Sequence, residues 1–275
     1  MAQDTGKFRK NEKDQYYTRQ EVSKSCVNKI QELLPQTSSW LWIEPSAGNG
    51  SFLKACQDLQ TLGIDLDPKA PGIEKGDFLQ WTPVTDVKRI VFGNPPFGRQ
   101  GSMAKAFIQH ASEFSDCIAF ILPRSFVKPS MSRAFPLNFH CIHSEELTKN
   151  SFEVNGSLYD VPCVFQIWEK RRSNREVKEA VGPVGFDYVK ENYDFAFRRV
   201  GGKAGTCYPK DVPCCKQAHY FLSLDPEYKP HVKKIIDIIN VHVFPSNTVG
   251  PRSLSKGEVN EVINGILADL PELPQ

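Results

Sequence analysis

The chain has 275 residues, with 34 Lys and Arg against 32 Asp and Glu and a formal net charge of +2. At roughly 150 residues per domain, this length predicts two domains or one large domain with an appendage. A composition of 40% hydrophobic and 24% charged residues excludes a disordered chain, a collagen-like fibre and a coiled coil. The small net charge also excludes a globally basic nucleic-acid coat, whereas a local basic patch is compatible with it.

The cysteines and the first residues bear on location. The 8 cysteines are scattered, and the polar start at Met1 lacks the apolar h-region of a signal peptide. The longest apolar run, Cys117 to Leu122, is too short to span a bilayer. We therefore expect an intracellular protein, cytoplasmic or nuclear, with reduced thiols and no association with a membrane.

Most of the chain alternates short apolar runs with helical patterns. Residues 1–15 are charge-rich and are expected to form a mobile tail, after which Thr18 is predicted to cap a helix that ends at Pro35. Strands are then predicted at 40–43, 62–65, 89–92 and 117–122, with helices at 51–59 and about 103–111, and two more strands at 139–143 and 161–168. This alternation predicts a doubly wound, Rossmann-like α/β sheet.

The composition changes near Lys170, where residues 169–178 hold mostly charged side chains. Beyond that point the pattern predicts strands at 193–198 and 220–224 and helices at about 232–239 and 257–270. We therefore expect a first domain at 16–170 and a small C-terminal α+β appendage at 171–275.

The first chemical motif follows a predicted strand and begins a helix. It reads Glu44-Pro45-Ser46-Ala47-Gly48-Asn49-Gly50-Ser51-Phe52. Small residues let a ligand approach the backbone closely, and a helix start offers unpaired N–H groups. Asp65 ends the next strand, where an acid can bind the hydroxyl groups of a ribose.

The second motif, Gly93-Asn94-Pro95-Pro96-Phe97-Gly98, follows a later predicted strand. The side-chain oxygen of Asn94 and the carbonyl of Pro95 are both placed to accept hydrogen bonds from one planar NH₂ group. Phe97 is placed to stack on the ring that carries this group. Two such hydrogen bonds would draw the nitrogen toward tetrahedral geometry and free its lone pair for attack.

The two motifs, in this order, resemble those of S-adenosylmethionine-dependent amino-methyltransferases, above all the gamma-class adenine-N6 DNA methyltransferases. The resemblance covers about 16–170 and implies a class I methyltransferase sheet that binds S-adenosylmethionine. By this resemblance the catalytic residues are Asn94, Pro95, Pro96 and Phe97, and the cofactor-binding residues are Tyr17, Thr18, Glu44, Ser46, Gly48, Gly50, Asp65, Asp77 and Phe78. The implied reaction is methyl transfer to N6 of adenine in DNA.

The substrate contacts rest on fewer residues. The resemblance implies that Phe97 and Phe152 lie against the target base, and Arg99 and Arg124 are candidate contacts to nucleic-acid phosphates. Residues 171–275 would form a small substrate-binding region. This region is short for a full DNA-reading domain, so the nucleic-acid type stays open and RNA is an alternative to DNA.

Two other functions are compatible with the motifs. Related enzymes use Asn-Pro-Pro-aromatic to hold a protein glutamine, and a non-catalytic subunit would keep the fold and pair with an active partner. A zinc site at Cys207, Cys214, Cys215 and His219 lacks the usual ligand spacing, so no metal is expected.

Overall fold

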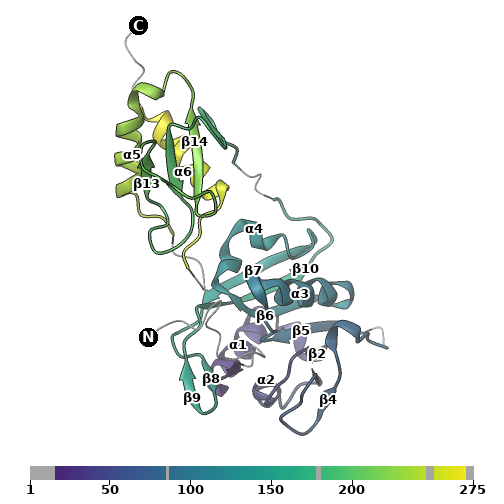
Figure 1. Ribbon diagram of the computed structural model, residues 1–275. Coiled ribbons are helices and arrows are strands. Elements are labelled where there is room, and N and C mark those ends of the chain that lie inside the picture. The colour runs from purple at the N-terminus through teal and green to yellow at the C-terminus, as the bar shows by residue number, and fades with distance from the viewer. Residues whose placement is uncertain (1–15, 85–86, 178–180, 246–250, 271–275) are drawn as a thin grey trace. The chain divides into compact units, whose positions relative to one another are not determined.

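The computed structural model describes residues 16–84, 87–177, 181–245 and 251–270, and the tail expected at 1–15 lies outside these ranges. The chain divides between residues 177 and 178 into two compact units, which we call the first and the second unit (Figure 1). Among the described residues, no helix combines the length and the apolar character needed to cross a membrane.

A seven-stranded sheet organises the first unit, in the order β4-β3-β2-β5-β6-β10-β7. The strands are β2 (Leu41–Glu44), β3 (Thr61–Asp65), β4 (Ile73–Lys75), β5 (Arg89–Gly93), β6 (Cys117–Pro123), β7 (Phe139–Glu146) and β10 (Cys163–Lys170). The five strands from β4 to β6 are parallel, whereas β10 runs antiparallel to both β6 and β7. The chain order reverses at β2, so ligands are expected at the carboxyl ends of β2 and β5.

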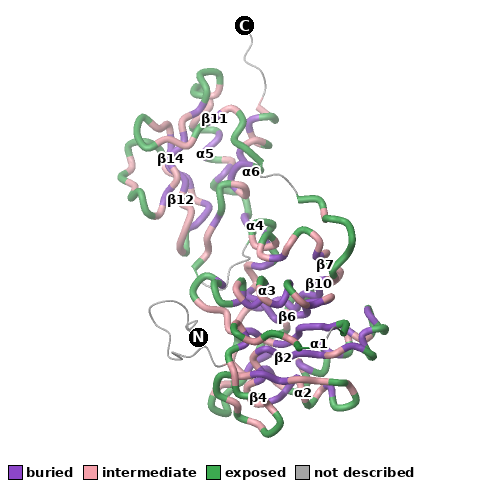
Figure 2. The backbone as a smooth tube through the Cα atoms, turned by 90° about the vertical axis from the view of Figure 1, so that its right-hand side faces the viewer, coloured by how far each residue is buried: buried purple, intermediate pink, exposed green. Residues whose placement is uncertain are grey.

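Helices cover both faces of this sheet, as a doubly wound fold requires. Helices α1 (Gln20–Leu33) and α2 (Ser51–Ala55) pack on one face and α3 (Ser102–Phe114) packs on the other. Because successive strand residues point to opposite faces, Trp42 joins the core under α1 and its neighbour Ile43 joins the core under α3. The central strands are accordingly buried along their length (Figure 2).

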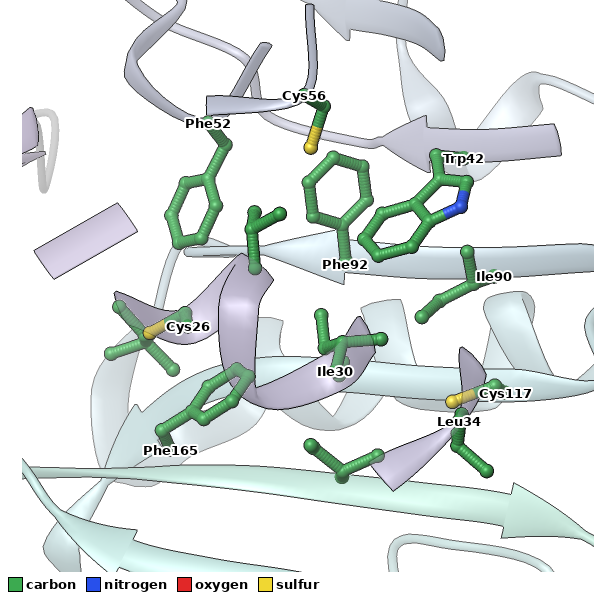
Figure 3. Packing of buried hydrophobic residues seen from close by; sticks show 14 of the residues in the cluster. Cys26, Ile30, Leu34, Trp42, Phe52, Cys56, Ile90, Phe92, Cys117 and Phe165 are labelled. Carbon is green, nitrogen blue, oxygen red and sulfur yellow. The ribbon is translucent and has the colours of Figure 1, made fainter. Parts of the chain in front are cut away.

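Aromatic rings fill the core between the sheet and α2 (Figure 3). The ring of Phe92 meets Trp42 edge-on at a centroid distance of 5.1 Å and Phe52 at 5.8 Å. Such edge-to-face pairs add to the free energy gained by burying the rings. They fix the end of β5 immediately before the second motif.

The N-terminal helix begins differently from the sequence prediction. Thr18 does not cap it; instead Thr18 pairs with Phe152 in a small antiparallel sheet, and Arg19 is the residue before the first turn. This sheet has the order β1-β8-β9, with β1 at Tyr17–Thr18, β8 at Phe152–Val154 and β9 at Ser157–Tyr159. The pairing joins segments more than 130 positions apart, which a local capping pattern cannot reveal.

The predicted helix at 51–59 is also shorter than expected. Helix α2 ends at Ala55, and the chain continues in turns closed by bonds from the Cys56 N–H to Leu53 and from the Leu59 N–H to Cys56. The apolar side chains at helical spacing therefore reach the core from a helix followed by a turn.

Arg175 holds the last residues of the first unit against the sheet. Its guanidinium donates hydrogen bonds to the carbonyl oxygens of Ser132, Phe135, Pro136 and Phe139. It also lies over the ring of Trp168, 5.2 Å from the centroid. The short helix α4 (Pro129–Ser132) and the start of β7 are thereby fixed to the segment that follows β10.

The second unit is a four-stranded antiparallel sheet with two helices, in agreement with the predicted α+β class. The sheet has the order β11-β14-β12-β13, and its elements are β11 (Phe186–Tyr188), β12 (Phe195–Arg198), β13 (Cys207–Pro209), β14 (His219–Leu224), α5 (Val232–Val241) and α6 (Lys256–Ala268). A capping box between Ser255 and Glu258 begins α6. One apolar core lies between the sheet and both helices.

Candidate active site

A hollow of about 420 Å³ lies at the carboxyl ends of β2, β3 and β5. Its volume is within the range of small-molecule sites. The predicted residues that line it are Tyr17, Ser46, Gly48, Asp65, Asp77, Phe78, Asn94, Pro95, Pro96 and Phe97. The fold thus brings the two motifs of the sequence to one cavity.

The glycine loop after β2 is fixed to Asp65 at the end of β3. One oxygen of the Asp65 carboxylate accepts a hydrogen bond from the Gly48 N–H at 2.7 Å, and the other accepts one from the Asp67 N–H at 2.7 Å. Gly48 has a φ of +48°, and a Cβ there would lie 3.0 Å from the Tyr17 ring. The loop therefore needs glycine, while the further lone pairs of the carboxylate keep capacity to accept from a ligand.

Glu44 is a buried acid at the end of β2. It is 2% exposed, and within the described part of the chain its Oε2 has no hydrogen-bond partner. Burial, followed by the charge of Asp65, raises the pKa of Glu44 well above its usual value, and a backbone hydrogen bond from Leu53 opposes this shift. A buried oxygen without a partner marks a place where a ligand donor would be stabilising.

The side chain of Asn94 has one fixed orientation. Its Nδ2 donates to the carbonyl oxygen of Tyr16 at 3.0 Å, and Ser46 Oγ donates to its backbone carbonyl at 2.9 Å. Because only the NH₂ group can donate to a carbonyl, Oδ1 is left as an acceptor, and no described residue pairs with it. Asn94 therefore offers an acceptor to a ligand that carries N–H groups.

Aromatic and apolar side chains form the walls of the hollow. Phe97 follows the two prolines, and Phe78 packs against Phe107 of α3 at a centroid distance of 5.2 Å. Asp77, beside Phe78, uses Oδ1 to accept from the Leu79 N–H and so begins a short 3₁₀ turn. These walls are suited to flat, apolar rings with polar edges.

The sequence interpretation assigned no site role to part of this lining. Leu66, Met103 and Phe107 also face the hollow, as does Tyr16, where the family resemblance begins. Met103 and Phe107 lie one turn apart on α3, so their spacing was a usable signal, although the same spacing is typical of core residues.

Several residues predicted for the site lie outside the hollow, and the buried Glu44 is one of them. Phe152 is a correction: it is completely buried in the core as part of β8, so its ring has no exposed surface for a base. Thr18 is buried in β1, and Gly50 precedes α2 with a φ of +74°. Arg99 is exposed on a 3₁₀ turn after the second motif, and Arg124 forms an ion pair with Glu146 at 3.1 Å.

The described residues contain no group of three or more His, Cys, Asp and Glu side chains placed to hold a metal ion. Of the residues weighed for a zinc site, Cys215 and His219 lie 3.9 Å apart, measured from Sγ to Nδ1.

The strand order, with its antiparallel β10 between β6 and β7, decides the fold. The first unit has the class I methyltransferase fold. No protein-family model matches the chain, and no curated protein matches its sequence.

Solved structures similar to this chain include a “putative RNA methyltransferase” from Pyrococcus horikoshii. It is 20% identical, and the match covers 59% of this chain and 91% of that one with a TM-score of 0.47. Magnesium protoporphyrin IX methyltransferase from Synechocystis PCC 6803, with bound SAM, is 12% identical over 55% of this chain and 79% of its own, with a TM-score of 0.40.

Proposed function

We propose that this chain transfers a methyl group from S-adenosylmethionine to the exocyclic N6 amino group of adenine in DNA. The observation that carries the proposal is the oriented amide of Asn94, whose Oδ1 is an acceptor without a partner among the described residues. An exocyclic amino group supplies the N–H donor that this oxygen lacks. Phe97, three residues on, supplies an aromatic face for the ring.

The polar groups in the hollow, together with the buried Glu44 outside its lining, fit the proposed cofactor. The Asp65 carboxylate would accept from the ribose hydroxyls, and Glu44 Oε2 would gain a donor from the amino group of the methionine part. Asp77 would accept a hydrogen bond from the amino group of the cofactor's adenine, and Phe78 would pack on the face of that ring. When bound, S-adenosylmethionine supplies a sulfonium methyl group, which the amino nitrogen accepts as the C–S bond breaks and the nitrogen proton leaves to water.

The protein residues then act mainly by orientation and electrostatics. Asn94 Oδ1 and the Pro95 carbonyl would accept from the two hydrogens of the amino group. These bonds draw the nitrogen toward tetrahedral geometry and direct its lone pair at the methyl group. The mechanism requires no strong base before the transfer.

Access to the amino group requires that the base leave the helical stack or come from a single strand. We assign contacts with the polymer to Arg99 and Arg124 and to the second unit, as part of the same proposal. Arg99 is exposed beside the second motif, whereas Arg124 would have to exchange its ion pair with Glu146 for a phosphate.

The test is transfer of labelled methyl groups to duplex DNA, single-stranded DNA, RNA and a protein extract, followed by digestion to nucleosides or amino acids. Asn94→Ala is compared with wild type, and Asn174→Ala, at an exposed position after β10, is the matched control. N6-methyladenine in DNA from wild type and the control, but not from Asn94→Ala, supports the proposal. Label in RNA alone overturns the choice of polymer, and label in protein alone favours a glutamine substrate. Cofactor binding without any transfer favours a non-catalytic subunit.

A further inference from the structure

The acceptor role of Asn94 depends on the backbone of a residue that is distant in sequence, Tyr16, whose side chain also lines the hollow. Asn94 Nδ2 donates to the carbonyl of Tyr16, 78 positions away. If that carbonyl moved, the side-chain amide would be free to turn and to present its NH₂ group instead of Oδ1. The placement of the Tyr16 backbone therefore controls which face of the amide the substrate meets.

Tyr16 is held by the β8–β9 hairpin. Its ring packs on the ring of Tyr159 in β9, with centroids 5.4 Å apart and planes inclined by 44°. Tyr159 pairs with Phe152 in β8, and Phe152 pairs with Thr18, two residues beyond Tyr16. The hairpin thus contacts this segment through its backbone ladder and through one aromatic side chain.

The hairpin is itself firmly seated. Phe152 is completely buried in the core under α1, and the Arg19 N–H donates to the carbonyl of Ser151 at 3.1 Å. Tyr159 is half-buried and packs at the edge of the same core, as Tyr16 and Phe97 do. The burial of Phe152 therefore has a use other than the base contact predicted for it.

We propose that Tyr159 is a positioning residue, which acts through the Tyr16 carbonyl to keep Asn94 Oδ1 facing the substrate. It does not line the hollow, and its ring contacts that of Tyr16, which does. The proposal rests on the proposed function for its kinetic consequence. Its structural part, the fixed amide of Asn94, stands without that function.

The kinetic test compares Tyr159→Leu, which removes the ring, with Tyr159→Phe, which keeps it. Leu158→Ala, at an exposed neighbour in β9, is the control for damage to the hairpin. We expect Tyr159→Leu to lower kcat about tenfold or more, since small misplacements of a reacting group cost rates of this order. KM for S-adenosylmethionine should change little, and Tyr159→Phe and Leu158→Ala should stay within about twofold of wild type. Equal losses in Tyr159→Leu and Leu158→Ala would overturn the proposal.

A second measurement does not depend on activity. The side-chain NH₂ resonances of Asn94, assigned by their loss in Asn94→Asp, report its hydrogen bond to Tyr16. They should shift in Tyr159→Leu and remain in place in Tyr159→Phe. Unchanged resonances would show that Tyr159 does not position the amide. If wild type methylates none of the substrates, the proposed function fails while this measurement still decides the role of Tyr159.

Discussion

The buried carboxyl of Glu44 makes the stability of the ligand-free protein depend on pH in a definite direction. Burial and the Asp65 charge raise its pKa well above the usual value, so the folded state keeps a proton that the unfolded chain releases near pH 4.3. Stability should then fall as the pH rises from about 4.3 toward the raised pKa, by up to about 1.4 kcal/mol per pH unit. Glu44→Gln keeps the size of the side chain and removes this titration.

The assay is urea unfolding of wild type and Glu44→Gln at pH 5, 6 and 7, without cofactor. Tryptophan fluorescence follows the first unit alone, because all 4 tryptophans, at 40, 42, 81 and 168, lie within it. The free energy of unfolding of wild type, relative to the variant, should decrease as the pH rises, by at most about 1.4 kcal/mol per pH unit, until the raised pKa of Glu44 is passed. Glu74→Gln, an exposed glutamate in β4, should show no such trend. A constant or rising difference between wild type and Glu44→Gln would refute the reasoning.

Two further predictions concern the carboxylate in the hollow and the guanidinium at the end of the first unit. Asp65→Asn should weaken binding of S-adenosylmethionine about tenfold or more, because one strong acceptor becomes a donor. Calorimetry measures this affinity, with the exposed Asp58→Asn as control. Equal affinities of wild type and Asp65→Asn would contradict the prediction. Arg175→Lys should lower the free energy of unfolding by about 1–3 kcal/mol, since lysine cannot serve four carbonyl groups from one planar fork. Fluorescence-detected urea unfolding tests it against Arg172→Lys, an exposed neighbour, and matching midpoints for the two variants would exclude this role.

The sequence predicted the central strands well because each is a short apolar run that ends in a polar or glycine-rich loop. Those loop positions also locate the hollow, since parallel strands place their carboxyl ends at one edge of a sheet. The contacts that complete the hollow were not predictable in this way. The bond from Asn94 to Tyr16 and the pairing of Thr18 with Phe152 join distant segments through the backbone, which leaves no pattern in the residue types.

A similar argument applies to the side chains. Phe152 in a loop-like stretch was equally compatible with packing and with base contact, and only its burial in the core distinguishes the two. The isolation of Glu44 Oε2 is likewise a property of the surrounding atoms.

The hydrogen bond from Ser46 Oγ to the Asn94 carbonyl links the loop after β2 to the loop after β5. Under the proposed function the first loop meets the methyl donor and the second meets the acceptor base. If binding of one ligand stabilises this hydrogen bond, the other ligand meets a site that is already ordered. By thermodynamic linkage, each ligand should then raise the affinity of the protein for the other by the same factor. We therefore expect the methyl donor and the acceptor base to bind cooperatively, whichever binds first. Ser46→Ala should reduce the effect of each ligand on the affinity for the other by the same factor.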